Sequence, residues 1–421
     1  MWVSELRPGL TLTRPVRDVN GRLLMGEGTL LTERFISVLK AWGVAEVAVL
    51  GEGPSCAGEG AGDDSADDPQ QEADPGNAAL AREIVALRLA NNPASHPFVG
   101  DVHRLAVARL VARLNRGGSF HVPPGVTPLP LQGPPAQYPL DPKSLAESNP
   151  VIGAMPEVLA RLAQVMDDPS AFPAELAEII QGDPGLSARL LNVVDSPFYG
   201  FSQRIDTISR AVTIIGVQQL SALALGMAVM DLFKNVSHSS LDVHGFWRHS
   251  LATACGARAL ASAVGLPNTE RYFVGGLLHD LGLLLLLLRE PRKECAALEL
   301  TRGQGWTLSA AERHLMGLDH AKAGAALLKA WKLPPGLVQA AGYHHEPLRS
   351  PDVREAAIVH TADFLAEALV FGSGGQTVLM PLSTAAFDKL GAPSGVACTV
   401  FERVENQLDH LERVFMSHGA S

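Results

Sequence analysis

The sequence predicts a mainly α-helical protein: a multi-helix bundle with a small α+β domain at the N-terminus and flexible linkers. Hydrophobic residues make up 47% of the 421 residues and aromatic residues only 5%. The apolar share is dominated by Ala, Leu and Val, which favours packing of helix on helix over an aromatic-rich sandwich or barrel. Apolar residues recur at helical spacing through the second half, and two linker-like stretches divide the first half.

Residues 1–53 are predicted to form the small α+β module. Two short β-type runs, Thr11–Val16 and Val44–Leu50, flank the pair Asn20-Gly21, which is typical of hairpin turns. A helical pattern over Thr32–Trp42 follows, with its first residue as the expected N-cap.

Two linkers and a helical segment separate this module from the rest of the chain. Residues 54–77 almost lack large apolar side chains and predict an acidic disordered linker. Residues 78–116 regain helical periodicity, and Pro93 and Pro97 are expected to divide them into two helices. The many Pro and Gly residues of 117–142 predict a second, stiffer linker.

From about residue 143 the pattern is helical almost throughout. Asp183-Pro184 is a strong start signal, with Asp as N-cap and Pro at the first helical position. The nearly continuous apolar helix Leu220–Phe233 is expected in the centre of the core. Gly216, Gly265 and Gly336 are expected at helix ends or turns.

The charge of the chain is concentrated in one tract. The formal net charge is −10, from 34 basic and 44 acidic residues. Between Gly51 and Leu80 there are eight acidic residues and no Lys or Arg, which leaves 36 acidic against 34 basic residues elsewhere. The folded parts are therefore close to neutral and show no basic cluster, which argues against bulk nucleic-acid binding and against attraction to anionic membranes.

The chain reads as cytoplasmic. Its four cysteines lie far apart without a CxxC pair, which suits a reducing compartment. The N-terminus shows no signal-peptide pattern. The longest apolar run, Leu281–Leu288, is too short for a membrane span of about 20 residues and predicts a buried helix.

Histidine and aspartate residues recur along the Ala- and Leu-rich helices of the second half. Such groups are costly to bury without partners, and a shared divalent cation would satisfy several at once. Imidazole and carboxylate ligands with open positions suit Mn, Fe, Zn or Mg and could activate a water for phosphoester hydrolysis. The predicted metal ligands are His249, His279, Asp280 and Asp363, with His320, His344 and His345 as additional ligands that would allow a second metal. An internally hydrogen-bonded polar cluster without metal is the alternative.

The order of these residues resembles the HD superfamily of metal-dependent phosphohydrolases. The wider succession of DPGLSARLL, SPFYG, IDTISRAVTIIG, FWRHS, GLLHDLG, LLKAWKLP and YHHEP resembles the HDOD domain over residues 143–347. The resemblance implies an all-helical module of bacterial signalling proteins, many of which are thought to lack enzymatic activity. Residues 348–421 are then expected to be a C-terminal helical extension that packs on this domain. Residues 1–53 resemble, more weakly, small domains that precede HD-type signalling modules.

Two departures from catalytic relatives bear on activity. HD-GYP phosphodiesterases carry Gly-Lys after the His-Asp pair and a GYP signature further on, whereas this chain has Gly282 and then Leu283, and no GYP. Phosphoester chemistry generally needs cations to neutralise developing charge. Arg248 and Lys322 are the residues that could make phosphate contacts instead.

Three functions follow as hypotheses. The first is a bacterial signal-transduction protein whose HDOD module is a non-catalytic regulatory scaffold for other signalling proteins. The second is a metal-dependent phosphohydrolase that cleaves a nucleotide or cyclic dinucleotide. The third is a receptor that binds a nucleotide or cyclic dinucleotide without hydrolysis.

Overall fold

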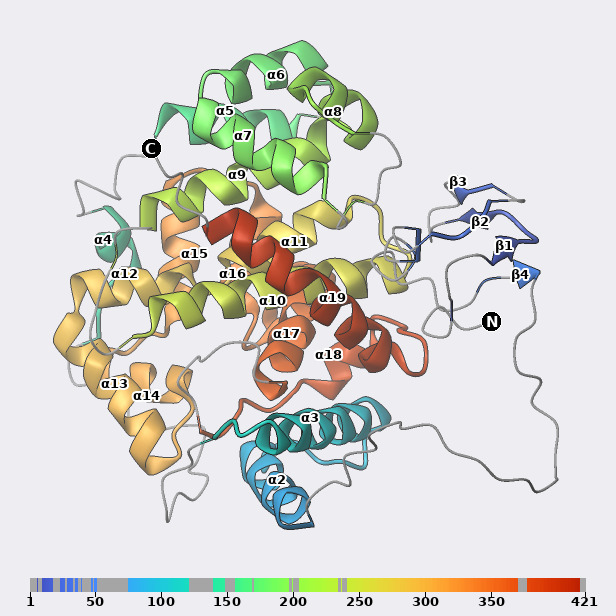
Figure 1. Cartoon of the computed structure of the whole chain (residues 1–421). Coiled ribbons are helices and arrows are strands. Elements are labelled where there is room, and N and C mark those ends of the chain that lie inside the picture. The colour runs from blue at the N-terminus through green and yellow to red at the C-terminus, as the bar shows by residue number, and fades with distance from the viewer. Residues whose placement is uncertain are drawn as a thin grey trace, which may run out of the picture.

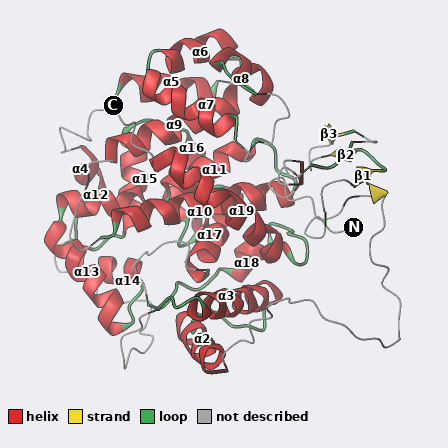
Figure 2. Cartoon of the chain, viewed as in Figure 1, coloured by secondary structure: helices red, strands yellow, loops and turns green. Residues whose placement is uncertain are grey.

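The computed structural model confirms the mainly α-helical fold (Figures 1 and 2). It describes residues 75–120, 139–147, 156–168, 170–196, 199, 204–233, 236, 241–369 and 377–416, together with parts of 6–50. Strands among the described residues are confined to the N-terminal module, and helices make up the body (Figure 2).

The N-terminal module contains two small antiparallel sheets. One pairs β1 (Thr11–Leu12) with β4 (Val49–Leu50), and the other pairs β2 (Val16–Arg17) with β3 (Leu23–Met25). The β2–β3 pairing is the one that a hairpin at Asn20-Gly21 would produce, although that turn lies outside the described residues. The predicted helix over 32–42 falls largely outside them too, but the Phe35 amide donates to Thr32 Oγ1 at 3.3 Å, as the predicted N-cap requires.

Helices α2 (Pro75–Arg88) and α3 (Pro97–Asn115) pack against each other beside α17 and α19 (Figure 1). The segment divides into two helices as predicted: Pro93 lies in the loop between them, and Pro97 is the first residue of α3, where its missing amide donor costs nothing. Helix α2 begins three residues before the predicted start at 78. Most of the two predicted linkers, residues 51–74 and 121–138, lies outside the described part of the chain.

Four helices, α5 to α8, gather at one end of the body (Figure 1). The bounds of the helices up to the central α9 are α4 Pro142–Glu147, α5 Glu157–Asp167, α6 Pro173–Gln181, α7 Pro184–Val194, α8 Ile208–Ile215 and α9 Val217–Phe233. Asp183 caps α7 by accepting from the Leu186 amide at 3.0 Å, and α9 is buried along almost its whole length. Both features confirm the sequence predictions.

The remaining helices surround α10 and form the second half of the body. Their bounds are α10 Val243–Ala263, α11 Thr269–Leu278, α12 Leu281–Arg289, α13 Pro291–Gln304, α14 Leu308–Met316, α15 His320–Ala330, α16 Pro335–Tyr343, η2 Pro347–Arg349, α17 Val353–Ala368, α18 Thr384–Asp388 and α19 Val396–Met416. Helix α10 packs against α11, α17 and α19 at once. Gly336 lies in the first turn of α16, at a helix end as expected.

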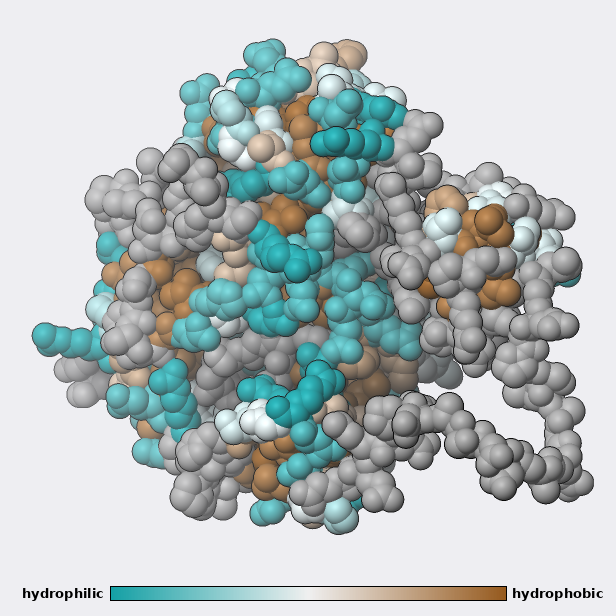
Figure 3. Space-filling view, viewed as in Figure 1, coloured by the Kyte–Doolittle hydropathy of each residue, from teal (hydrophilic) through white to brown (hydrophobic). Residues whose placement is uncertain are grey.

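One apolar segment of the described chain is long enough to cross a membrane. It runs from Thr269 to Arg289, and most of it is buried inside the body. Its helix is interrupted at His279 and Asp280, where α11 ends and α12 begins. Its apolar side chains are therefore explained by packing between helices. On the face shown in Figure 3, polar side chains cover most of the described surface, with small apolar patches between them.

Two glycines allow the close helix contacts that position the polar cluster. A Cβ on Gly276 of α11 would lie 2.8 Å from Ala254 Cα of α10. A Cβ on Gly282 of α12 would lie 1.9 Å from the carbonyl oxygen of His320, at the start of α15. Both contacts involve backbone atoms, which cannot move aside as the end of a side chain can.

Candidate metal centre

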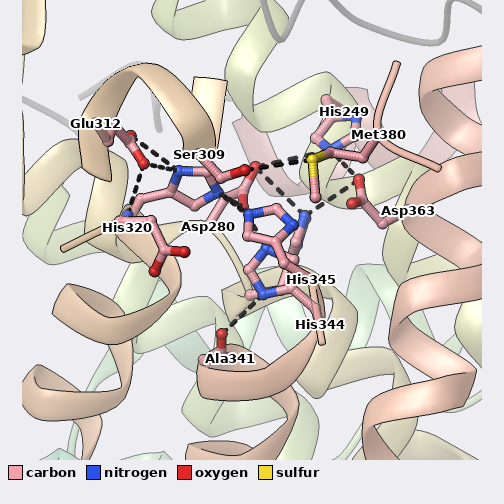
Figure 4. A network of polar contacts seen from close by, with 12 residues as sticks. His249, Asp280, Ser309, Glu312, His320, Ala341, His344, His345, Asp363 and Met380 are labelled. Carbon is pink, nitrogen blue, oxygen red and sulfur yellow. Dashed lines mark hydrogen bonds and ion pairs between the residues drawn. The ribbon is translucent and has the colours of Figure 1, made fainter. Parts of the chain in front are cut away.

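The structure brings all seven predicted ligands together (Figure 4). His249 comes from α10 and Asp363 from α17. His279 and Asp280 form the junction of α11 and α12, which turns both side chains into the centre. His320 is the first residue of α15, and His344 and His345 follow α16.

One oxygen of Asp280 faces a first set of donors, made of His249, His279 and Asp363. His249 Nε2 lies 3.0 Å from Asp363 Oδ1 and 3.8 Å from Asp280 Oδ2. His279 Nε2 lies 3.3 Å from Asp280 Oδ2 and 3.5 Å from Asp363 Oδ1. Donors that share one cation at about 2.1 Å lie about 3.0 to 3.4 Å apart, so two of these four separations fit a common metal ion and the other two are longer by up to about 0.4 Å.

The other oxygen of Asp280 faces a second set, made of His320, His344 and His345. Asp280 Oδ1 lies 3.3 Å from His320 Nε2 and 3.4 Å from His344 Nε2. His345 Nε2 lies 2.8 Å from His320 Nε2. Asp280 therefore stands between two groups of donors, in the position of a carboxylate that bridges two cations.

Backbone contacts orient two imidazoles of the centre. His279 Nδ1 donates to the carbonyl of Gly276 at 2.7 Å, and His344 Nδ1 donates to that of Ala341 at 2.7 Å. In both residues Nε2 faces the centre and is buried, and beyond the ion-pair contacts given above it has no hydrogen-bond partner among the described residues; the same holds for Asp280 Oδ1. Buried polar atoms are rarely left in this state, and a cation would satisfy all three. The residues therefore fit a metal.

Charge interactions within the centre oppose the effects of burial. Burial lowers the pKa of His279, but Asp280 and Asp363 outweigh it and raise this pKa to about 10. Burial raises the pKa of both aspartates, but the facing imidazoles hold each pKa well below its usual range. The pKa of His345 is well below its usual value because of burial and the neighbouring His344 and His320. Both carboxylates are thus ionised near neutral pH, as cation ligands must be, whereas His279 is protonated in the absence of a cation and must lose that proton to bind one.

Two glutamates beside the centre were not among the predicted ligands. Glu312 of α14 is fully buried, accepts from the His320 amide at 2.8 Å and lies 2.7 Å from His320 Nδ1. Burial raises the pKa of Glu312, and the charge of His320 opposes this. Glu367 lines the same cavity one helical turn after Asp363, and burial and Asp363 raise its pKa to about 7. The four-residue spacing from Asp363 is the sequence signal that could have revealed Glu367.

The imidazole ring of His360 makes its hydrogen bonds with residues outside its own helix, α17. Its Nδ1 donates to the carbonyl of His344 at 2.5 Å, and its Nε2 accepts from the Ser383 amide at 2.8 Å. Burial lowers the pKa of His360 to about 4, which agrees with a neutral ring that donates at one nitrogen and accepts at the other. His360 therefore supports the backbone of a predicted ligand.

Glu312→Gln is expected to weaken cation binding about 10- to 100-fold, because a carboxylate behind a ligating imidazole fixes its orientation and raises its basicity. Competition with a coloured chelator measures the affinity. Glu299→Gln, an exposed change on α13, is the matched control and should leave the affinity as it is. Equal affinities in the two variants would contradict the orienting role of Glu312.

The cavity at the centre is very small. Its volume is about 10 Å³, and its ten described lining residues include Leu283 but no Lys or Arg. The two residues predicted to contact phosphate are engaged elsewhere. Arg248 pairs with Asp409 and Glu412 of α19, while the Lys322 ammonium group donates to the Gly342 carbonyl at 3.1 Å.

Comparison with known proteins shows that part of this chain is similar to one family. The family model for the HDOD domain matches residues 152–347. A solved HDOD domain protein of unknown function from Geobacter sulfurreducens is 26% identical, with a TM-score of 0.54, over 62% of this chain and 91% of that one. A candidate signal transduction protein from Marinobacter aquaeolei is 20% identical, with a TM-score of 0.53, over 80% of this chain and 69% of that one. The second likeness shows the fold alone.

A curated relative extends the comparison at the level of sequence. It is an uncharacterized protein from Treponema pallidum (strain Nichols), 23% identical over 210 residues. The aligned part is 50% of this chain and 40% of that protein, so the chain spans less than half the length of this relative. The family match, the helical fold and the His and Asp centre agree with one another: residues 152–347 of this chain match the HDOD domain.

Proposed function

We propose that this chain is a signalling protein whose HDOD domain holds one or two divalent cations in a closed centre and acts through contacts with other proteins rather than through turnover. The observation that carries the proposal is the cavity of about 10 Å³, which five of the seven candidate ligands line. Small-molecule sites usually measure about 300 to 1,000 Å³. This cavity admits a water-sized group but neither a nucleotide nor a cyclic dinucleotide.

The character of the cavity wall supports a non-catalytic role. Leu283 stands where catalytic relatives are expected to carry Lys, and it is buried against the cavity with Leu308 and Phe246. These side chains supply no positive charge for a phosphoryl group, which such chemistry requires. In this interpretation, the cations stabilise a junction of six helices, α10, α11, α12, α15, α16 and α17, and partner proteins recognise the surface of that junction. The signal-transduction name of the Marinobacter protein is consistent with this role.

Phosphohydrolase activity is the second candidate, and the complete ligand set favours it. Both carboxylates and all five histidines converge, and Asp280 has one oxygen toward each set. A cation held by these residues would polarise a phosphoester and lower the pKa of a bound water. For this activity the cavity would have to open, because a phosphoester does not fit into it.

Metal content and turnover together test the proposal. The full chain, equilibrated in turn with Mn²⁺, Fe²⁺ and Zn²⁺ and then desalted, is expected to retain cation by elemental analysis. It is also expected to hydrolyse neither bis(p-nitrophenyl) phosphate nor cyclic dinucleotides above the rate of His279→Ala. His103→Ala, on α3 outside the cluster, is the control for loss of a histidine.

The two parts of the proposal can fail separately. Turnover that disappears in His279→Ala but persists in His103→Ala would establish the phosphohydrolase instead. A chain that retains no cation under any of these conditions would contradict the metal centre and favour a purely hydrogen-bonded cluster.

A further inference from the structure

Helices α13 and α14 form a pair that lies over the metal centre. They pack on each other and join the body through α12 and α15, and they project from it in Figure 1. Leu308 of α14 lines the cavity, and Glu312 of the same helix contacts His320. The wall of the cavity opposite α14 is formed in part by Asp363 and Glu367 of α17.

An extended segment, residues 377–383, ties this helix pair to α17. We call it the strap. Thr377 Oγ1 donates to the Arg302 carbonyl of α13 at 3.4 Å, and the Ser309 hydroxyl of α14 donates to Met380 Sδ at 3.2 Å (Figure 4). At its other end, the Ser383 amide donates to His360 of α17 at 2.8 Å. The strap therefore runs from one side of the cavity to the other.

The backbone of the strap is held by the loop that follows α2. Asn92 uses both ends of its amide, donating to the Met380 carbonyl at 3.1 Å and accepting from the Leu382 amide at 2.7 Å. The Leu379 amide donates to the Arg88 carbonyl at 2.9 Å, and the Arg88 guanidinium donates to the Glu367 carbonyl at 2.8 Å. Asn92 is itself buried, with an exposed fraction of 5%.

We propose that α13–α14 is a flap over the metal centre and that the strap, held by Asn92, is the latch that keeps it closed. The inference rests on the proposed metal centre. Opening the flap withdraws Leu308 from the cavity and Glu312 from His320, so it both exposes the centre and weakens it. Lid motions commonly control access to such sites, and the hydrogen bonds of the strap would have to break for the flap to open.

The positions of the latch residues indicate which part of the chain would control the latch. Arg88, Asn92 and the strap all lie outside residues 152–347, which match the HDOD domain. A shift of α2 and α3 relative to the body would therefore loosen the flap over the metal centre, because it would disturb the hydrogen bonds of Asn92 with the strap. By linkage, cation binding, which favours an oriented His320, must in turn stabilise the closed flap.

Asn92→Ala tests the latch, with Asn91→Ala as its matched control. The side-chain nitrogen of Asn91 makes no hydrogen bond among the described residues. Removing the two bonds of Asn92 is expected to speed hydrogen exchange at the Leu379 and Leu382 amides about tenfold. Release of preloaded Co²⁺ to a chelator should speed up by a similar factor, and Asn91→Ala should change neither rate. Cation in the wild-type chain should slow exchange at both amides.

A measurement on metal-free protein separates this inference from the proposed function. Diethyl pyrocarbonate modifies accessible imidazoles, and mass spectrometry locates the modified residues. We expect His345 and His249 to be modified about tenfold faster in Asn92→Ala than in Asn91→Ala, whether or not the chain retains a cation. If the wild type retains no cation but this difference is found, the flap proposal is supported and the metal-centre proposal is contradicted.

The opposite results overturn the latch. If Asn92→Ala speeds amide exchange in the strap without speeding either Co²⁺ release or modification, then the strap opens but does not control access. If amide exchange is unchanged, Asn92 does not hold the strap. Should Asn92→Ala fail to fold, Ser309→Ala removes the Met380 contact with a smaller loss of volume and is judged by the same criteria.

Discussion

Replacing Gly282 with alanine is expected to destabilise the protein by about 3 kcal/mol, near the upper end for overpacked cores. The added Cβ would lie 1.9 Å from the His320 carbonyl oxygen and 2.5 Å from the Gly324 nitrogen. Both atoms belong to the backbone of α15, so α12 and α15 must separate. Equilibrium unfolding in urea, followed by circular dichroism, measures the loss as a lower midpoint at unchanged slope.

Gly336→Ala is the matched control for this prediction. Gly336 also lies within a helix, but its new Cβ would meet nothing closer than the Glu355 carboxylate at 3.6 Å. Alanine there should be neutral or stabilise by up to about 1 kcal/mol, since it reduces the entropy of the unfolded chain. A similar midpoint for the two variants would show that α12 and α15 can part without cost.

Gly282→Ala should also weaken cation binding at the metal centre. Separation of α12 from α15 moves His320 away from Asp280, because Asp280 is the N-cap of α12 and His320 is the first residue of α15. A Gly282→Ala chain that still folds should therefore bind cation less tightly than the Gly336→Ala chain. The glycine that follows the His-Asp pair thus has a packing role of its own, whatever the chemistry of the domain.

The convergence of the seven candidate ligands could be predicted because their chemistry is unusual for their surroundings. A histidine or an aspartate on an Ala- and Leu-rich helix face stands out from its neighbours, and the resemblance supplied the order. His360 also stands out, but it bonds the His344 carbonyl and Ser383 instead of the centre. Periodicity does not distinguish a buried histidine that binds metal from one that supports a backbone.

The closed state of the centre could not be predicted from local pattern. It depends on contacts between residues almost 300 positions apart, such as Asn92 with Met380, which no periodicity or spacing reveals. The ion pairs of Arg248 could not be predicted for the same reason. Its charge suggested a phosphate contact, but acidic residues on α19, more than 150 positions later, form ion pairs with it. Helix type and core burial depend on local composition and are therefore easier to predict.

Asp280→Ala is expected to abolish cation binding at both sets of ligands, lowering the affinity by more than about a hundredfold, since loss of even an outer-shell partner costs 10- to 100-fold. Asp280 is the residue that faces both sets, with Oδ2 toward His279 and Oδ1 toward His320 and His344. Elemental analysis of the folded variant, with Asp242→Ala as an exposed aspartate control, measures the effect.

Asp363→Ala sharpens this prediction because the ion pairs of Asp363 join it to the first set, although its carboxylate also lies within 4.8 Å of ligand atoms of His279 and His344. Its carboxylate lies 3.0 Å from His249 and 3.5 Å from His279, and no ion pair joins it to His320 or His344 among the described residues. A chain that binds two cations should therefore keep one in Asp363→Ala and none in Asp280→Ala. Equal losses of bound cation in the two variants would mean that a single cation is held by all the donors together. If Asp280→Ala retained all of its cation, Asp280 would not be a bridging ligand.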